Sequence, residues 1–202
     1  MKIIKLILLD DHELVLEGIK STLQKEDDFS IVGAYTETNE FMLFLKNYSV
    51  DIVVMDMMLK EKHAFDLISE INQMKNQRPK IILISGFYEP LLHKRALELG
   101  VWAFLRKEVT YDELVNTIKS VNHGNKVFPE HLFLINDYKL LSEIELNVLN
   151  LVAQEHTNEK IAKQLYISRR TVETHISTIC NKLNVNTRIG AVREGIKLNL
   201  IK

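Results

Sequence analysis

The chain has 202 residues, of which 46% are hydrophobic and 26% are charged, and its formal net charge is −1. This composition excludes a disordered chain and indicates one large or two small globular domains. No apolar run reaches the roughly 20 residues that span a bilayer, and the N-terminus lacks a small-residue cleavage site, so we expect neither membrane insertion nor a signal peptide. The single cysteine, Cys180, excludes an intramolecular disulfide and is typical of the reducing cytoplasm.

The charge is distributed unevenly along the chain. Residues 1–138 contain 16 Lys/Arg and 21 Asp/Glu, a net charge of −5, whereas residues 139–202 contain 10 and 6, a net charge of +4. An acidic front and a basic back indicate two modules that have different partners.

The first 122 residues alternate strongly apolar segments with segments of helical spacing. Strands are predicted over 3–9, 29–35, 51–56, 80–85 and 102–105, and helices over 13–25, 38–48, 65–75, 90–100 and 110–122. Strands this apolar are buried on both faces, and the alternation is typical of a parallel sheet wrapped by helices. We therefore predict an α/β domain with a doubly wound, five-stranded parallel sheet over residues 1–122.

The rest of the chain is predicted to be a linker followed by a small helical domain. Residues 123–138 contain a Gly and a Pro but no clean period, which indicates a linker with a short helical turn at 129–134. Ser142 and Glu145 have the spacing of a capping box, and Ser168 is a candidate helix cap. Helices are predicted over 144–154, 158–165, 168–183 and 187–201, which makes residues 139–202 a small all-α domain.

Polar residues follow four of the predicted strands. Asp10 and Asp11 follow the first strand, Asp56 ends the third, Ser85 ends the fourth, and Lys107 follows the fifth. In a doubly wound sheet, ligands bind at this edge. Three carboxylates repel one another, and Mg²⁺ relieves that repulsion with the oxygen ligands it prefers. A phosphoryl group on the third-strand aspartate would need charge neutralisation of the kind that Mg²⁺ and the lysine supply. Singly, each residue also fits an ordinary solvated loop residue or helix cap.

Together with Phe104, these residues resemble a response-regulator receiver domain over residues 1 to about 122. The resemblance implies a flavodoxin-like fold in which a sensor histidine kinase phosphorylates Asp56. It also implies that Mg²⁺ is bound by Asp11, Asp56 and the backbone carbonyl of Met58, with Asp10 acting indirectly.

The resemblance assigns Ser85, Phe104 and Lys107 to phosphate binding and switching. The serine hydroxyl would move toward the phosphoryl group and the aromatic ring would follow inward. The face that changes would be built either by the helix at 90–100, the strand at 102–105 and the helix at 110–122, or by the helices at 13–25 and 110–122.

This sequence departs from the family pattern in the loop after Asp56. The family usually has proline four residues and glycine eight residues after the phosphoacceptor, where this chain has Lys60 and Ala64. The resemblance places Met58 and Phe87 at the mouth of the pocket, where bulky apolar side chains shield an acyl phosphate from water. We therefore expect a less rigid loop and slow self-dephosphorylation.

The helical domain has the pattern of a helix-turn-helix. In the helix at 168–183, Val172, Ile176, Ile179 and Leu183 form a core stripe, and polar residues occupy the other face. The turn before this helix would let it enter a DNA major groove.

Residues 139–202 resemble a LuxR-type DNA-binding domain, and a receiver followed by this domain is the NarL/FixJ architecture. The resemblance implies that Glu173, Thr174 and Ser177 face base edges in double-stranded DNA. Contacts with DNA phosphates give affinity but little sequence information, and the resemblance assigns them to five residues. These are Lys160, Arg169, Arg170, Thr171 and Lys182.

Three residues or groups of residues in this domain have open alternatives. Glu173, where many members have lysine, either accepts from cytosine N4 or pairs with Arg169 or Arg170. Cys180 is either a small packing residue or a redox group. The last helix carries Ile189, Val192 and Ile196, which form either a dimer surface or a face that packs within the domain.

We interpret the chain as a cytoplasmic two-component response regulator that binds paired DNA half-sites as a dimer when phosphorylated, and not as an enzyme. One alternative is a phosphorylation-independent regulator with an atypical loop at 60–64. An aspartyl-nucleophile phosphatase would want an acid where Met58 stands. An RNA-binding antiterminator or a helical protein-interaction domain fits the helix-turn-helix pattern poorly.

Overall fold

The computed structural model describes residues 3–74, 78–129 and 139–202. Contacts between residues divide the chain into two compact units, Met1–Asn136 and Asp137–Lys202. The ends of the predicted linker, residues 123 and 138, stay a prediction. The helical turn expected at 129–134 falls, except for residue 129, outside the described residues. None of the helices in the described ranges is long and apolar enough to cross a membrane.

The first unit is built on a parallel sheet. Its strands are β1 (Ile4–Leu9), β2 (Phe29–Tyr35), β3 (Ile52–Asp56), β4 (Lys80–Ser85) and β5 (Ala103–Arg106). Their order in space is β2-β1-β3-β4-β5, and every neighbouring pair is parallel, which confirms the predicted five-stranded, doubly wound sheet. The strand order reverses between β1 and β3, and this is where such sheets bind ligands.

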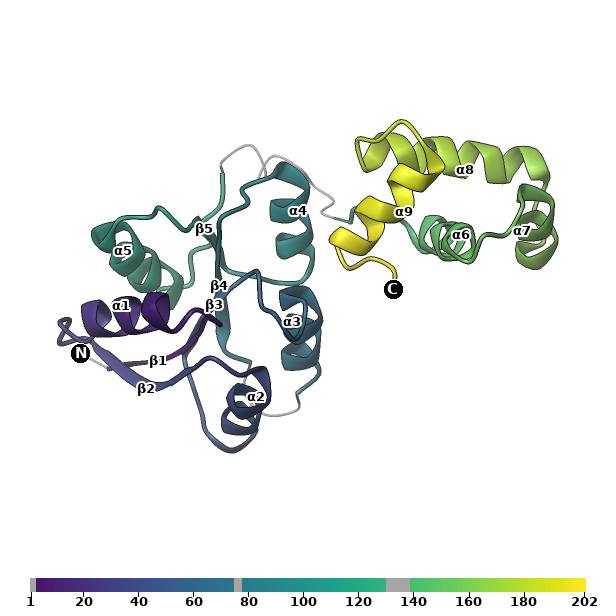
Figure 1. Ribbon diagram of the computed structural model, residues 1–202. Coiled ribbons are helices and arrows are strands. Elements are labelled where there is room, and N and C mark those ends of the chain that lie inside the picture. Colours follow the sequence, from purple (N-terminus) through teal and green to yellow (C-terminus); the bar gives the residue numbers. More distant parts are fainter. Residues whose placement is uncertain (1–2, 75–77, 130–138) are drawn as a thin grey trace. The chain divides into compact units, whose positions relative to one another are not determined.

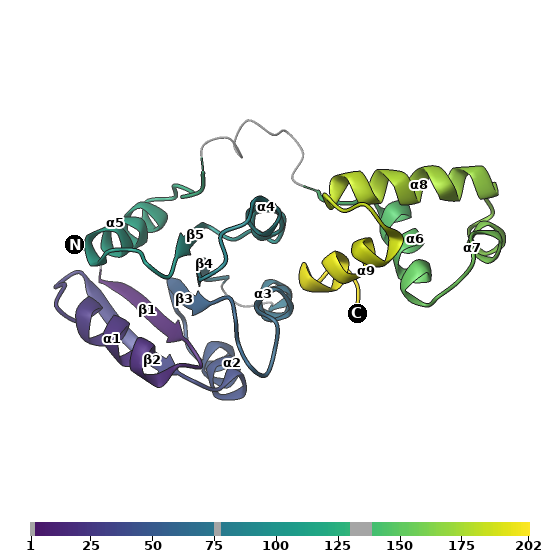
Figure 2. The same ribbon diagram turned by 45° about the horizontal axis from the view of Figure 1, so that its top comes forward.

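Helices cover both faces of this sheet because the strands are apolar on both sides. On one face lie α1 (Glu13–Leu23) and α5 (Tyr111–Asn122), and on the other lie α2 (Thr38–Asn47), α3 (Ala64–Gln73) and α4 (Pro90–Glu98) (Figures 1 and 2). A continuous apolar core joins alternate residues of the strands to α1 and α5; Leu6, Leu8, Ile82, Leu114 and Ile118 are among its buried members.

The outer edge of β5 is paired with the chain that follows α5. Val127 forms a parallel bridge with Ala103, and its N–H donates to the carbonyl oxygen of Trp102 at 2.8 Å. Phe128 is also buried. The first residues of the predicted linker therefore lie along the edge of the sheet.

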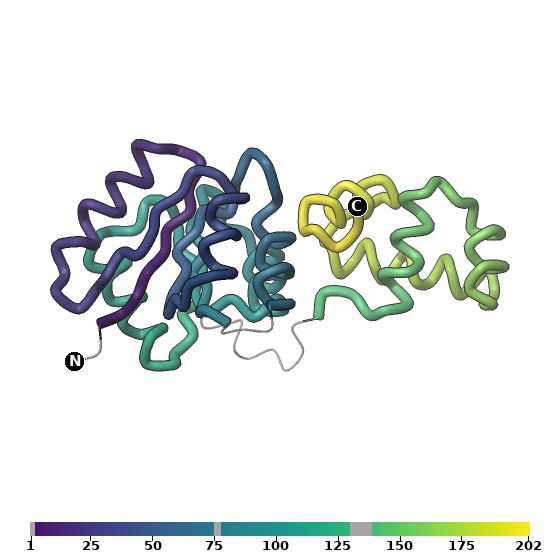
Figure 3. Tube along the Cα trace, turned by 90° about the horizontal axis from the view of Figure 1, so that it is seen from below, coloured from purple at the N-terminus to yellow at the C-terminus, as the bar shows by residue number. Residues whose placement is uncertain are grey.

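The second unit consists of helices over the described residues 139–202. They are α6 (Glu143–Ala153), α7 (Asn158–Leu165), α8 (Arg169–Lys182) and α9 (Arg188–Lys197), and Figure 3 traces them in green to yellow. The predicted capping box is present, because the Ser142 N–H donates to the Glu145 carboxylate at 2.7 Å and the Ser142 hydroxyl accepts from the Glu145 N–H. Ser168 caps α8 as predicted. The last helix ends at Lys197, four residues before its predicted end, because Asn199 takes a left-handed φ of 51°.

Candidate functional site

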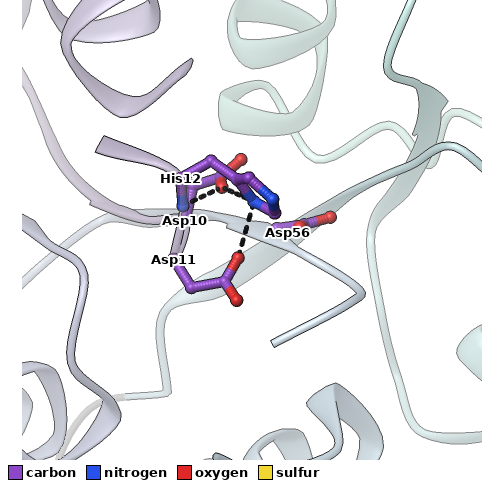
Figure 4. Close-up of side chains that lie close together, drawn as sticks. All are labelled: Asp10, Asp11, His12 and Asp56. Atoms are coloured by element: carbon purple, nitrogen blue, oxygen red, sulfur yellow. Dashed lines mark hydrogen bonds and ion pairs between the residues drawn. The ribbon is translucent and has the colours of Figure 1, made fainter. Parts of the chain in front are cut away.

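Four side chains converge at the carboxyl edge of the sheet. Asp10, Asp11 and His12 follow β1, Asp56 ends β3, and each offers a ligand atom within 4.8 Å of the others (Figure 4). The adjacency of β1 and β3 brings the predicted carboxylates together. The sequence analysis did not predict His12 as part of this cluster. Its position directly after two acids was the feature that could have indicated it. Its Nδ1 lies 2.7 Å from Asp11 Oδ1 and 3.3 Å from Asp10 Oδ1.

The two oxygens of the Asp56 carboxylate have different surroundings. Oδ2 accepts a hydrogen bond from Lys107 Nζ at 2.8 Å. Oδ1 is buried and accepts no hydrogen bond from the part of the chain that the structure describes. Burial raises the pKa of the Asp56 carboxyl group, and the hydrogen bonds from Lys107 and the Met58 backbone oppose this. Asp56 is thus a buried carboxylate with one uncommitted oxygen.

Lys107 is held over the carboxylates by its own main chain. Its N–H donates to the carbonyl oxygen of Ser85 at 2.9 Å, which links the loop after β5 to the end of β4. Its Nζ also lies 3.5 Å from Asp10 Oδ2. Burial works to lower the pKa of Lys107, but the hydrogen bond and charge of Asp56, with Asp10, outweigh it and raise the pKa. The ammonium therefore stays charged beside Asp56 at neutral pH.

The predicted switch pair is buried beside this pocket. The Ser85 side chain is fully buried, and its hydroxyl accepts from the Phe87 N–H at 3.0 Å. The Phe104 ring is 1% exposed and makes edge contacts with the rings of His93 and Tyr88, at centroid distances of 4.7 and 5.9 Å. The ring is already inward in this structure.

The residues present fit a divalent cation. Asp56 Oδ1 is buried and accepts no hydrogen bond within the described ranges, although buried polar atoms normally have partners. Asp11 Oδ1 is also buried and lies 2.7 Å from His12 Nδ1. A hard cation prefers oxygen ligands of this kind. The acidic cluster of Asp10, Asp11 and Asp56 is therefore consistent with a metal site, whereas the role of the Met58 carbonyl stays a prediction.

In the second unit, α8 presents a polar face. Val172, Ile179 and Leu183 are buried and Ile176 is half-buried, as the predicted core stripe requires. Glu173, Thr174 and Ser177 are exposed, together with Arg169, Arg170, Lys160 and Lys182. Their contacts with DNA, like that of the half-buried Thr171, stay predictions. Sequence reasoning missed Tyr166, which is 95% exposed in the turn between α7 and α8.

Three of the predicted DNA contacts, Arg169, Glu173 and Lys182, are engaged in ion pairs within the unit. Arg169 Nε lies 2.9 Å from Glu173 Oε1, and Arg169 also pairs with Glu159 at 2.6 Å, so the pairing alternative for Glu173 is present in this structure. Lys182 Nζ lies 2.7 Å from the buried carboxylate of Glu145. Burial works to raise the pKa of Glu145, but the hydrogen bonds from Lys182 and Ser142 prevail and lower it.

Comparisons with known proteins match both units. Residues 6–119 match the family of response regulator receiver domains, and residues 139–194 match the luxR family of bacterial regulatory proteins. The chain is 30% identical over 210 residues to the response regulator protein VraR of Staphylococcus aureus strain Mu3, which covers 98% of this chain and 99% of VraR.

Solved structures show the same fold. A complex of the two-component response regulator RcsB with DNA matches with a TM-score of 0.68 and 23% identity, over 96% of this chain and 98% of that chain. RcsB from Salmonella enterica serovar Typhimurium, bound to promoter rprA in the presence of phosphomimetic BeF₃⁻, matches with a TM-score of 0.61 and 22% identity, over 96% and 98%.

A buried aspartate among acids and a lysine, at the carboxyl edge of a doubly wound sheet, together with a helix-turn-helix unit, defines a signal-receiving regulator that binds DNA. The receiver family alone matches more than half of the chain, and the luxR family matches most of the rest. The chain belongs to the two-component response regulators of the NarL/FixJ family, with a receiver domain and a LuxR-type DNA-binding domain. The family confirms the prediction of a regulator rather than an enzyme.

Proposed function

We propose that Asp56 is the phosphoacceptor of this response regulator. The observation that carries the proposal is that the two oxygens of the Asp56 carboxylate have different hydrogen-bond partners. Oδ2 is held by Lys107 at 2.8 Å, while Oδ1 has no hydrogen-bond partner among the described residues. Oδ1 attacks the phosphorus of a phosphohistidine on a sensor kinase, the phosphorus–nitrogen bond breaks, and an acyl phosphate forms on Asp56. Lys107 stabilises the charge on the transferred group.

Asp11, Asp56 and the Met58 carbonyl would hold Mg²⁺, with Asp10 acting through water. When bound, Mg²⁺ supplies charge neutralisation for the phosphoryl oxygens. The clustering of Asp10, Asp11 and Asp56, whose ligand atoms lie within 4.8 Å of one another, supports this assignment. The Ser85 hydroxyl, now accepting from the Phe87 N–H, would turn to donate to a phosphoryl oxygen.

The output would be a dimer on paired DNA half-sites. One helix-turn-helix reads few base pairs, so two copies are needed for useful specificity. Two apolar residues of α9 remain exposed in this chain, Ile189 at 78% and Ile196 at 50%, and support a dimer surface there. The structures of RcsB, one of which is described as two dimers bound to two parallel DNAs, agree with this output. A regulator of this kind acts in the cytoplasm, where the kinase domain and DNA are found.

Fluorescence anisotropy with a promoter fragment, Mg²⁺ and acetyl phosphate tests the proposal. Acetyl phosphate should tighten binding by the wild type and leave Asp56→Ala unchanged. If both proteins bind equally with and without the donor, the chain binds DNA independently of phosphorylation, and the gating role of Asp56 is wrong.

A further inference from the structure

The loop after β3 places a second lysine ammonium group, in addition to that of Lys107, beside the acidic cluster. Lys60 lies four residues beyond Asp56, and its N–H donates to Asp11 Oδ2 at 3.1 Å. Its ammonium lies 3.7 Å from the same oxygen and donates to the backbone oxygen of Asp11 at 3.4 Å. Three separate contacts therefore join Lys60, in the loop after β3, to Asp11, which follows β1.

These contacts depend on Lys60 not being a proline. Proline has no N–H and no charge, so neither the hydrogen bond to Asp11 nor the ion pair could form. The other oxygen of Asp11 faces His12 Nδ1 at 2.7 Å, so both oxygens of this carboxylate lie beside nitrogen atoms of the protein itself. The Asp11 side chain is buried, while that of Lys60 is 73% exposed. The ammonium therefore acts on a buried carboxylate from the solvent side.

We infer that Lys60 competes with the divalent cation for Asp11 and weakens Mg²⁺ binding by the unphosphorylated receiver. The inference rests on the proposed function, in which Asp11 and Asp56 hold Mg²⁺. An ammonium that already partly neutralises Asp11 reduces the attraction for a second cation, and the two cations repel each other. Because Lys60 is largely exposed, the effect is modest and is screened by salt. Lys60 thus lowers the affinity of the pocket for the metal ion.

The test is calorimetric titration of MgCl₂ into the unphosphorylated full-length chain. Lys60→Ala keeps the N–H and removes the ammonium, and its dissociation constant for Mg²⁺ should fall about two- to fivefold. Lys62→Ala is the matched control, because Lys62 pairs with Glu70 of α3, and it should bind as the wild type does. Asp11→Asn should weaken binding strongly, which establishes the site.

Ionic strength separates competition from a change in loop structure. The difference between wild type and Lys60→Ala should shrink when KCl rises from about 0.05 M to about 0.5 M. If Asp11→Asn weakens binding while Lys60→Ala binds Mg²⁺ as the wild type does, the inference is wrong and the metal site stands. A salt-independent difference also overturns competition by charge. If Asp11→Asn binds as tightly as wild type, the metal site itself is misassigned and the inference fails with it.

Discussion

The main-chain N–H of Phe104 donates a hydrogen bond to the carbonyl oxygen of Val127, at 3.3 Å. Together with the bond from Val127 to Trp102, it ties the strand that carries the buried aromatic ring to the chain leading toward the DNA-binding unit. A shift of β5 near Phe104 would therefore pull directly on residue 127.

Val127→Pro should uncouple the receiver from DNA binding. Proline removes the N–H that donates to Trp102 and with it one of the two bonds. Acetyl phosphate should then tighten DNA binding severalfold less than in wild type, as measured by anisotropy, while calorimetric Mg²⁺ binding stays unchanged. Val127→Ala keeps the N–H and should respond like the wild type. A full response from Val127→Pro would contradict this route.

Asp56→Asn should stabilise the metal-free receiver at neutral pH. Burial raises the folded-state pKa of Asp56, so the folded form binds this proton more tightly than the unfolded form does. The ionised carboxylate therefore costs stability, a cost that is absent below the unfolded pKa of about 3.9 and complete above the raised folded pKa. Asparagine cannot ionise, so the melting temperature at pH 7 should rise by a few degrees.

Thermal melts with EDTA across pH 4 to 7 check this sign. The advantage of Asp56→Asn over wild type should disappear toward pH 4. Asp27→Asn, at an exposed position, should show no such trend. A variant less stable than wild type at pH 7 would mean that the ion pair with Lys107 outweighs the cost of burial.

The sequence was enough to predict the sheet and the acidic pocket for one physical reason. Parallel strands in alternation with helices place their carboxyl ends on one edge, so Asp10, Asp56 and Lys107 had to meet once the strands were recognised. The contacts of Lys60 could not be predicted, because they depend on the path of a loop that has no period. The edge pairing of Val127 was likewise hidden, since a single bridge leaves no pattern in the sequence.

The same limit applies to the switch and to the recognition helix. The sequence placed Phe104 beside the pocket, but the inward position of its ring depends on packing with Tyr88 and His93. On α8, spacing alone allowed Glu173 to pair with Arg169 or Arg170, or to accept from cytosine N4. Rotamers decide between those outcomes, and spacing does not determine them.

Met58→Asn should shorten the life of the acyl phosphate. Met58 is 50% exposed two residues after Asp56, and Phe87 is 53% exposed two residues after Ser85. Apolar groups there cannot orient an attacking water, whereas an amide can, so dephosphorylation should accelerate at least about tenfold. Loss of ³²P from the purified phosphoprotein gives the rate. Met58→Leu keeps the apolar shield and should match the wild type, and a wild-type lifetime of seconds would refute the shielding role.

Glu173 should determine base preference in addition to pairing with Arg169. The pair joins Glu173 Oε1 to Arg169 Nε at 2.9 Å, and the Glu173 side chain lies on the exposed face of α8. An exposed carboxylate on this face is able to accept from cytosine N4, and it repels phosphates. Glu173→Gln keeps the shape but loses the charge, and it should lose preference for cytosine at one position of sites selected from a random DNA pool.

Glu173→Lys separates the charge effect from the readout. It removes the partner of Arg169 and adds a cation, so DNA binding should tighten at low salt, and the slope of log K against log salt should steepen by about one to two. Anisotropy across a salt series measures the slope. If all three proteins select the same sequences and differ only in slope, Glu173 acts through Arg169 and the phosphates alone. Altered selection by Glu173→Gln at an unchanged slope would instead place this carboxylate against a base edge.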